Sequence, residues 1–141
     1  MNKLSFLAAF TALACAAAQA QVSVDKPWVR TTVPQQTTTG AFMTITSVQG
    51  GKLVAASSPI AATVEVHEMK MDGDMMKMRA VDAVPLPAGR PVEFKPNGLH
   101  VMLTGLKAPL KAGDVVPIRL VVEDAKGKRE TVDVKAAARQ N

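Results

Sequence analysis

The sequence predicts an all-β fold, arranged as a single Greek-key β-sandwich domain. Glycine and proline, nine of each, recur along the whole chain after residue 20. Short runs with alternating apolar and polar residues lie between them, and the 3.6-residue period of a helix is almost absent. Short alternating runs at regular spacing, bounded by turn residues, are typical of sandwiches and barrels. Residues 21–141 are enough for one domain with one core.

The first half of this region divides into four runs that end at turn residues. Residues 22–30 form a first expected strand interrupted by Pro27, and residues 38–48 form a second. In the second run Met43 falls on the apolar face, so we assign it to the core. A glycine pair precedes the third strand, 52–57, and Ser58-Pro59 ends it. Residues 63–71 alternate, with Val64 and Val66 inward and Glu65, His67, Met69 and Met71 on the opposite face, which is the pattern of a strand with one buried face.

The second half begins with a hairpin, because Asp72-Gly73 is a strong hairpin signal between 63–71 and the return strand 75–81. We expect a turn over 86–89, short strands over 92–95 and 99–103, and a connection over 106–113. Residues 115–123 and 129–135 are the last expected strands, and 136–141 is expected to be a frayed tail. About nine short strands of this kind fit a sandwich of the immunoglobulin or cupredoxin type.

The N-terminus has the pattern of a secretory signal. Lys3 supplies the positive charge, residues 4–17 are almost wholly apolar, and Ala18-Gln19-Ala20 is a small-x-small cleavage site. The apolar stretch is short and rich in alanine for a membrane span. We therefore divide the chain into a cleaved signal, 1–20, and a domain, 21–141, and expect a periplasmic protein with no membrane span in the mature chain.

Cys15 is the only cysteine, and it falls inside this signal. A lipoprotein anchored through Cys15 is the alternative, although Leu13 stands one place too late for a good lipobox. After ordinary cleavage the chain has no thiol, which excludes disulfides, thiolate zinc sites, cysteine nucleophiles and blue-copper centres.

The formal net charge of +5 is spread over 17 basic and 12 acidic residues without a basic stripe. The aromatic residues after the signal are Trp28, Phe42 and Phe94. Nucleic-acid binding needs clustered cations with aromatic stacking platforms, so we expect no nucleic-acid partner.

Histidine and methionine gather in one window, residues 67–102. Both histidines lie there, with six of the eight methionines. Thioether sulfur and imidazole nitrogen are neutral donors that suit monovalent copper. The candidate ligands for Cu(I) are His67, Met78, His100 and Met102, and the possible accessory ligands are Met69 and Met76.

The hairpin gives a pairing prediction for the first two ligands. If Asp72-Gly73 is a two-residue turn, Met69 faces Met76 and His67 faces Met78, with Cβ atoms about 4.5–5.5 Å apart. His100 and Met102 are two residues apart and therefore lie on one face of another strand. Whether that strand meets the hairpin is left open by spacing alone.

The window resembles the periplasmic copper chaperone family PCuAC. Its motif is His or Met, ten residues, Met, twenty-one residues and His-x-Met, and His67, Met78 and His100-Val101-Met102 match that spacing. The segments Pro27–Arg30, Val66–Met69, Leu86–Gly89, His100–Leu103 and Gly113-Asp114 also resemble the family.

The resemblance implies a cupredoxin-like sandwich with a Cu(I) site at the four ligands. It also implies delivery of copper to the binuclear centre of cytochrome c oxidase, alone or with Sco-type thiol proteins. The tail 136–141 lacks the histidines and methionines of the C-terminal extension that some relatives carry. We therefore expect one main site. We also expect the protein to be a monomer and not an enzyme.

Two other functions fit the same residues. The site could sequester copper for tolerance instead of delivering it. The domain could instead be a β-sandwich assembly module with no metal, whose methionines form an adhesive surface.

Overall fold

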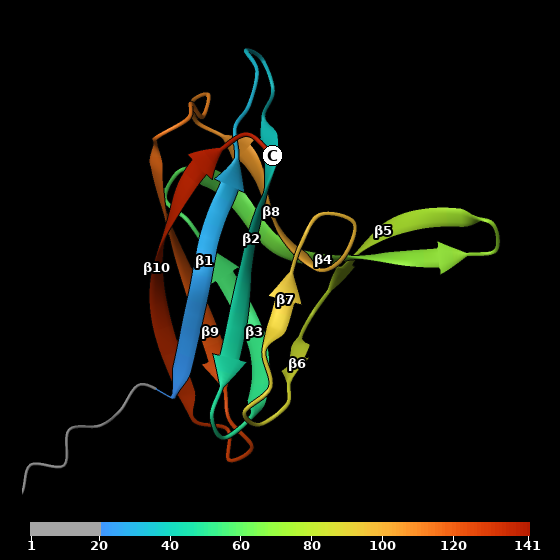
Figure 1. Ribbon diagram of the computed structural model, residues 1–141, viewed down its shortest axis with the longest axis vertical. Coiled ribbons are helices and arrows are strands. Elements are labelled where there is room, and N and C mark those ends of the chain that lie inside the picture. Colours follow the sequence, from blue (N-terminus) through green and yellow to red (C-terminus); the bar gives the residue numbers. More distant parts are fainter. Residues whose placement is uncertain (1–20) are drawn as a thin grey trace, which may run out of the picture.

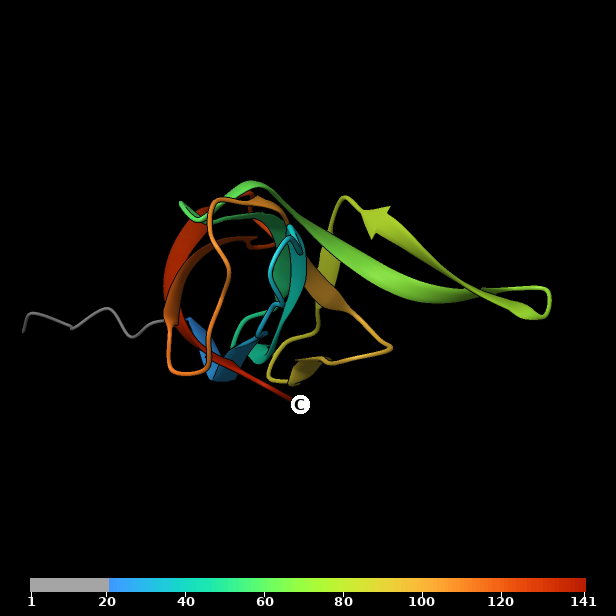
Figure 2. The same ribbon diagram turned by 90° about the horizontal axis from the view of Figure 1, so that it is seen from above.

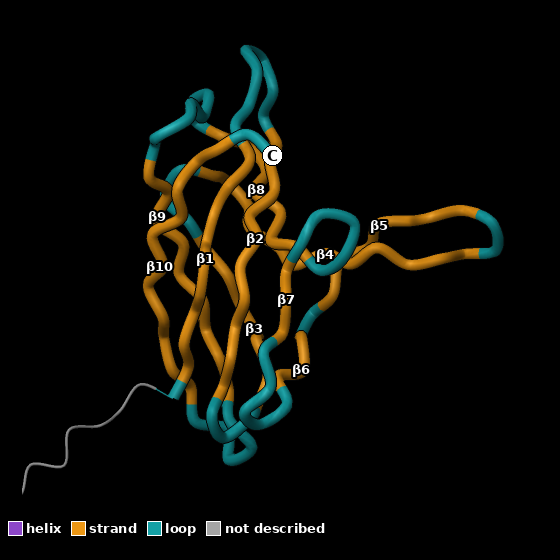
Figure 3. Tube along the Cα trace, viewed as in Figure 1, coloured by secondary structure: helices purple, strands orange, loops and turns teal. Residues whose placement is uncertain are grey.

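The computed structural model describes residues 21–141, and this part of the chain contains strands and loops but no helix (Figure 3). The all-β prediction is therefore confirmed. The predicted signal over 1–20 and its Cys15 lie outside the described residues.

Ten strands make one continuous sheet. They are β1 (Val22–Arg30), β2 (Thr38–Ser47), β3 (Gly51–Ser57), β4 (Ala61–Asp72), β5 (Met75–Val81), β6 (Val84–Leu86), β7 (Val92–Phe94), β8 (His100–Leu106), β9 (Val115–Glu123) and β10 (Arg129–Arg139). The order is β5-β4-β8-β2-β1-β10-β9-β3-β6, and β7 also pairs with β2. Seen from above, the sheet curls into a barrel-like body from which the β4–β5 hairpin extends (Figure 2).

Two segments differ from the sequence-based prediction. The expected turn over 86–89 is present, with Arg90 N–H donating to the Pro87 carbonyl oxygen, but the sequence predicted no strand before it, whereas Val84–Leu86 forms β6 and pairs with the start of β3. The expected frayed tail is also wrong: residues 136–139 complete β10, which pairs with β9 and runs parallel to β1. Ala136 and Ala138 are buried, so the small alternating side chains of this segment belong to the core rather than to a loose end.

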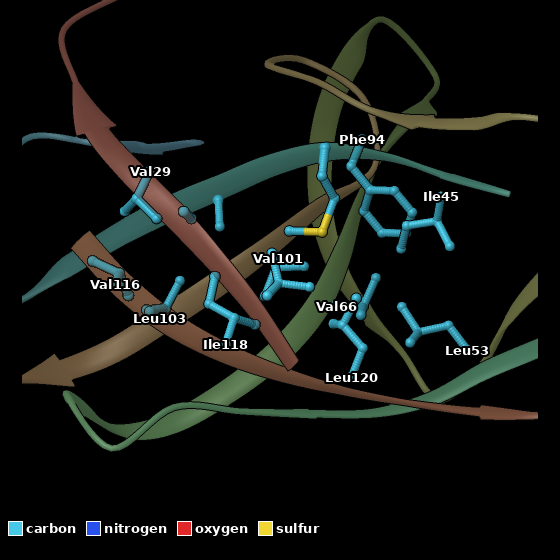
Figure 4. Packing of buried hydrophobic residues seen from close by; sticks show 14 of the residues in the cluster. Val29, Ile45, Leu53, Val66, Phe94, Val101, Leu103, Val116, Ile118 and Leu120 are labelled. Atoms are coloured by element: carbon cyan, nitrogen blue, oxygen red, sulfur yellow. The ribbon is translucent and has the colours of Figure 1, made fainter. Parts of the chain in front are cut away.

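The core occupies the inside of the barrel-like body (Figure 4). Leu103, Ile45 and Leu120 are fully buried there, and each such side chain contributes about 1.5–3 kcal/mol relative to an exposed one. Met43 is buried among them, as the sequence predicted. Val66 of β4 and Val101 of β8 also point into this core. Because side chains alternate along a strand, the neighbours of these valines are placed on the outer face.

The β4–β5 hairpin leaves the body because only part of β4 is paired on both sides. Residues 61–67 of β4 pair with β8, whereas beyond His67 the described partner of β4 is β5 alone. The hairpin therefore projects sideways from the barrel (Figure 1). Its turn is Gly73-Asp74, with Gly73 at φ 62° in the first central position, as a type II′ turn requires.

This turn changes the predicted hairpin register. The sequence placed Asp72-Gly73 at the centre, but Asp72 pairs with Met75 and the turn lies one residue later. Met78 consequently faces Met69 and not His67, and His67 faces Ala80. Each residue of β4 pairs two residues further along β5 than predicted. Because two is an even number, each side chain stays on the face that the sequence assigned to it.

Candidate metal site

The two histidines stand opposite each other on neighbouring strands. His67 of β4 and His100 of β8 are register partners, and their ring centroids are 5.9 Å apart. His67 follows the core residue Val66, and His100 precedes the core residue Val101. Alternation therefore turns both imidazoles to the outer face. The juxtaposition of the hairpin and the His100–Met102 strand, which spacing alone left open, is therefore present in the fold.

Met78 reaches this pair from β5. Its register partner Met69 lies two residues beyond His67, so Met69 and Met78 share the face of the imidazoles. The Met78 Sδ atom is 3.2 Å from His100 Nε2. Two ligands of one tetrahedral ion stand about 3.5 Å apart when metal bonds of about 2.0 Å to nitrogen and 2.3 Å to sulfur are assumed, as for zinc. The sulfur and nitrogen are thus spaced as a shared ion would need them.

Met102 completes the group from the body of the barrel. It pairs with Gly40 of β2 on one side and with Glu65 of β4 on the other. A surface hollow of about 280 Å³ opens beside it. The residues around this hollow are Arg30, Gln36, Thr38, Thr39, Gly40, Phe42, Met69, Met78, Pro96, Asn97, His100 and Met102. Three predicted ligands and the accessory candidate Met69 line it, while His67 and Met76 do not.

His100 is held in one orientation and one tautomer. Its Nδ1 is 2.9 Å from the Gly98 carbonyl oxygen, which can only accept, so Nδ1 carries the proton. In the neutral ring Nε2 then presents its lone pair, and this is the atom that faces Met78 Sδ. Only 6% of His100 is exposed, and the Phe42 ring lies 6.5 Å away behind it. A fixed, desolvated imidazole with a free lone pair is the usual state of a metal ligand.

His67 is oriented by a residue that sequence reasoning did not single out. Its Nε2 lies 3.0 Å from Oε2 of Glu65, so Nε2–H donates to the carboxylate. The other ring nitrogen, Nδ1, is buried and has no hydrogen-bond partner among the described residues. A buried polar atom without a partner is costly unless something binds it. The signal that could have revealed Glu65 is its position two residues before His67, on the same face of the strand.

The acidic residues of the hairpin do not add to this site. Glu68 pairs with Arg79 at 2.6 Å and Asp72 with Lys77 at 2.9 Å. Within residues 21–141 the acidic, histidine and cysteine side chains form no group of three that could hold a metal ion. Such exposed pairs contribute about 0–1 kcal/mol each to stability.

Arg30 also borders the hollow. Its guanidinium carbon lies 5.4 Å from the centroid of Phe42, and Trp28 packs against the same ring at 4.6 Å. Trp28 thus supports Phe42, which in turn backs His100. The aromatic pair therefore lies beside the imidazole.

A family model described as "Putative lipoprotein LpqE-like" matches residues 22–136. The chain belongs to this LpqE-like family. It is 32% identical to protein Lxx21020 of Leifsonia xyli subsp. xyli over 117 residues, covering 81% of this chain and 69% of that one. It is also 32% identical to protein RP573 of Rickettsia prowazekii over 126 residues, covering 85% of this chain and 68% of that one.

Solved structures share the LpqE-like fold seen here. The solution structure of CuI-DR1885 from Deinococcus radiodurans is 35% identical, with a TM-score of 0.67 and coverage of 89% of this chain and 84% of that one. The copper-bound PCuAC domain from PmoF2 is 22% identical, with a TM-score of 0.64 and coverage of 86% and 95%. The predicted cupredoxin-like fold class is confirmed. In the described part of the chain no helix is long and apolar enough to cross a membrane.

Proposed function

We propose that this protein is a copper chaperone that binds Cu(I) through His67, Met78, His100 and Met102. One observation carries the proposal: His100 Nε2 lies 3.2 Å from Met78 Sδ, while Nδ1 of the same ring is hydrogen-bonded to the Gly98 carbonyl oxygen. The buried, unpartnered Nδ1 of His67 on the adjoining strand supplies a second free nitrogen. Copper is the cargo of this protein and is expected to leave it.

The donor set suits the monovalent ion. Two thioethers and two neutral imidazoles bring no negative charge, and soft sulfur donors select Cu(I) over harder ions. A thioether has no proton to lose, so its binding does not depend on thiolate formation. The likeness to DR1885, whose Cu(I) form has been solved, supports the same cargo here.

The exposure of the ligands supports transfer. His100 is almost fully buried, whereas Met78 is 49% exposed and borders the open hollow. An incoming ligand of an acceptor can therefore displace Met78 first, while the histidines still hold the ion. Acceptors with thiolate ligands bind copper more tightly than thioethers do, which gives the exchange a direction.

The acceptor we propose is the copper-bearing subunit of cytochrome c oxidase, at its binuclear copper centre, directly or through a Sco-type thiol protein. This step rests on the resemblance of the His/Met motif. We also propose export to the periplasm, which the signal-like residues 1–20 and the lipoprotein description of the family support. We further propose that the chain acts as a monomer without enzymatic activity.

A titration of residues 21–141 with Cu(I) against a competing chelator tests the site. His67→Ala, Met78→Leu, His100→Ala and Met102→Leu should each weaken Cu(I) binding, while Met75→Leu, on the opposite hairpin face, should not. Wild-type affinity in all four ligand variants would disprove the assignment. X-ray absorption of the Cu(I) form should count two nitrogen and two sulfur neighbours.

A deletion strain separates delivery from sequestration. Delivery predicts low oxidase activity at limiting copper, which added copper restores. Normal oxidase activity with copper sensitivity would instead favour sequestration. A protein that takes up no Cu(I) but holds a stable protein partner would favour the assembly module.

A further inference from the structure

The projecting hairpin has two chemically different faces. The register pairs Met69 with Met78 and Met71 with Met76, and alternation puts all four on the side of the histidines. We call these four residues the methionine face. It runs from the hollow at the barrel to the tip of the hairpin.

The opposite face of the hairpin carries charge. Its ion pairs are Glu68 with Arg79 and Asp72 with Lys77. Met75, next to the turn, shares this charged side. The alternation of side chains along the hairpin therefore places the four thioethers on one face and the charged pairs on the other. The methionines are not placed at random around the turn.

Ordinary core packing does not account for the methionine face. Met71 is 57% exposed and Met76 is 50% exposed. Within residues 21–141, this part of β4 pairs only with β5, so the face lies uncovered beyond the barrel (Figures 1 and 2). Methionine in a core fills gaps, but here the thioethers stay accessible to solutes.

We propose that Met71 and Met76 form a second, outer site for a soft monovalent cation, which exchanges with the inner site through Met69 and Met78. This inference rests on the proposed Cu(I) function and deepens it. Opposed residues have Cβ atoms about 4.5–5.5 Å apart, so two flexible thioethers can converge on one ion.

The step from the outer to the inner site is short. Residues two apart along a strand are separated by about 6.6 Å, so each methionine lies within side-chain reach of the next on the same face. A cation moves by forming one metal–sulfur bond before another breaks. No electron or proton is transferred, and the ion keeps its single positive charge throughout. Two thioethers without imidazole bind more weakly than the inner set, so the outer site fills second.

The test uses residues 21–141, Ag⁺ as a redox-inert probe and Cu(I) as the cargo. Methionines labelled with ¹³C at the methyl group are followed by NMR during the titration. The signals of Met78 and Met102 should move with the first equivalent of Ag⁺, and those of Met71 and Met76 with the second. The Met71→Leu/Met76→Leu double variant should lose the second equivalent and release Cu(I) to a chelator more slowly than wild type.

Leucine keeps the apolar volume and removes only the sulfur, so it separates metal binding from a protein-docking surface. Met75→Leu is the matched control and should behave as wild type. A double variant that keeps the second equivalent and the wild-type release rate would overturn the outer site. If the proposed inner site is wrong, the result differs: His100→Ala should then bind the first equivalent of Ag⁺ with the same affinity as wild type. Unperturbed Met71 and Met76 signals, with a protein partner that the leucine double variant retains and the Met71→Ala/Met76→Ala variant loses, would also overturn the proposal.

Discussion

Replacing Glu65 probes how the fold prepares His67 for a ligand. The carboxylate accepts the Nε2 proton at 3.0 Å, which leaves the lone pair on the buried Nδ1. In Glu65→Ala the ring can turn and can carry its proton on either nitrogen. In Glu65→Gln the amide oxygen can still accept, but without the charge. Cu(I) affinity should therefore fall in the order wild type, Gln, Ala.

The exposure of the pair sets the size of this effect. The side chain of Glu65 is 54% exposed and that of His67 is 17% exposed, so solvent screens the interaction. Removing a partner that orients a metal ligand commonly costs about 10–100-fold in affinity. A half-exposed pair contributes about 1 kcal/mol at most, which corresponds to roughly fivefold in Kd. We expect about a fivefold loss for Glu65→Ala and a smaller one for Glu65→Gln.

Competition titration with a Cu(I) chelator measures the Kd of both variants for Cu(I). Thermal unfolding without metal checks that the fold of each variant is intact. Glu68→Ala is the matched control, because Glu68 lies on the same strand with the opposite face and pairs with Arg79. It should leave Kd unchanged. If Glu65→Ala binds Cu(I) as wild type does, or if Glu65→Gln is the weaker of the two, the tautomer argument is refuted.

Four further predictions concern the fold and its response to metal. Gly51→Ala should lower the thermal midpoint of unfolding more than Gly127→Ala does. Both glycines have positive φ, which costs about 1–2 kcal/mol for alanine. A Cβ at Gly51 would in addition lie 2.3 Å from a backbone oxygen. Leu103→Ala should cost about 2–5 kcal/mol in a denaturant titration, because its side chain is fully buried. Deleting 136–141 should destabilise the domain strongly by the same measurement, since it removes the parallel pairing with β1. Cu(I) should slow amide hydrogen exchange in β5 more than in β10, because an ion shared by Met78 and His100 ties β5 to the barrel.

The sequence predicted the faces of the strands more reliably than their partners. Alternation placed His67, His100 and Met102 opposite core valines, and the structure agrees. Alternation depends only on the period of the pleat and is local. The partner of a residue depends on which residues occupy the turn, and moving the turn by one residue shifts every pair. This is why Met78 faces Met69 and still comes within 3.2 Å of His100.

The contact between the two halves of the site could not be derived from spacing. It depends on β4 pairing with β8, two strands separated by 33 residues at the His67–His100 pair. Long-range pairing is set by packing of the whole core, here through Val66 and Val101. The missed β10 extension has a similar origin. An alanine-rich end has weak strand preference by itself, but here it pairs with β1 and buries the small side chains of Ala136 and Ala138 in the core.

The candidate site draws its ligands from two unlike parts of the fold. His100 and Met102 stand on β8, between β2 and β4 in the barrel, whereas Met78 stands on the hairpin strand β5 at the edge of the sheet. In the sheet β4 separates β5 from β8, so an ion bound by Met78 and His100 would bridge strands that are not neighbours. A chaperone has to hold copper and then release it. Ligands fixed in the barrel can preserve the geometry, while a ligand on an exposed hairpin can be displaced without disturbing the core. This division of the ligands is the physical reason to favour transfer over permanent storage.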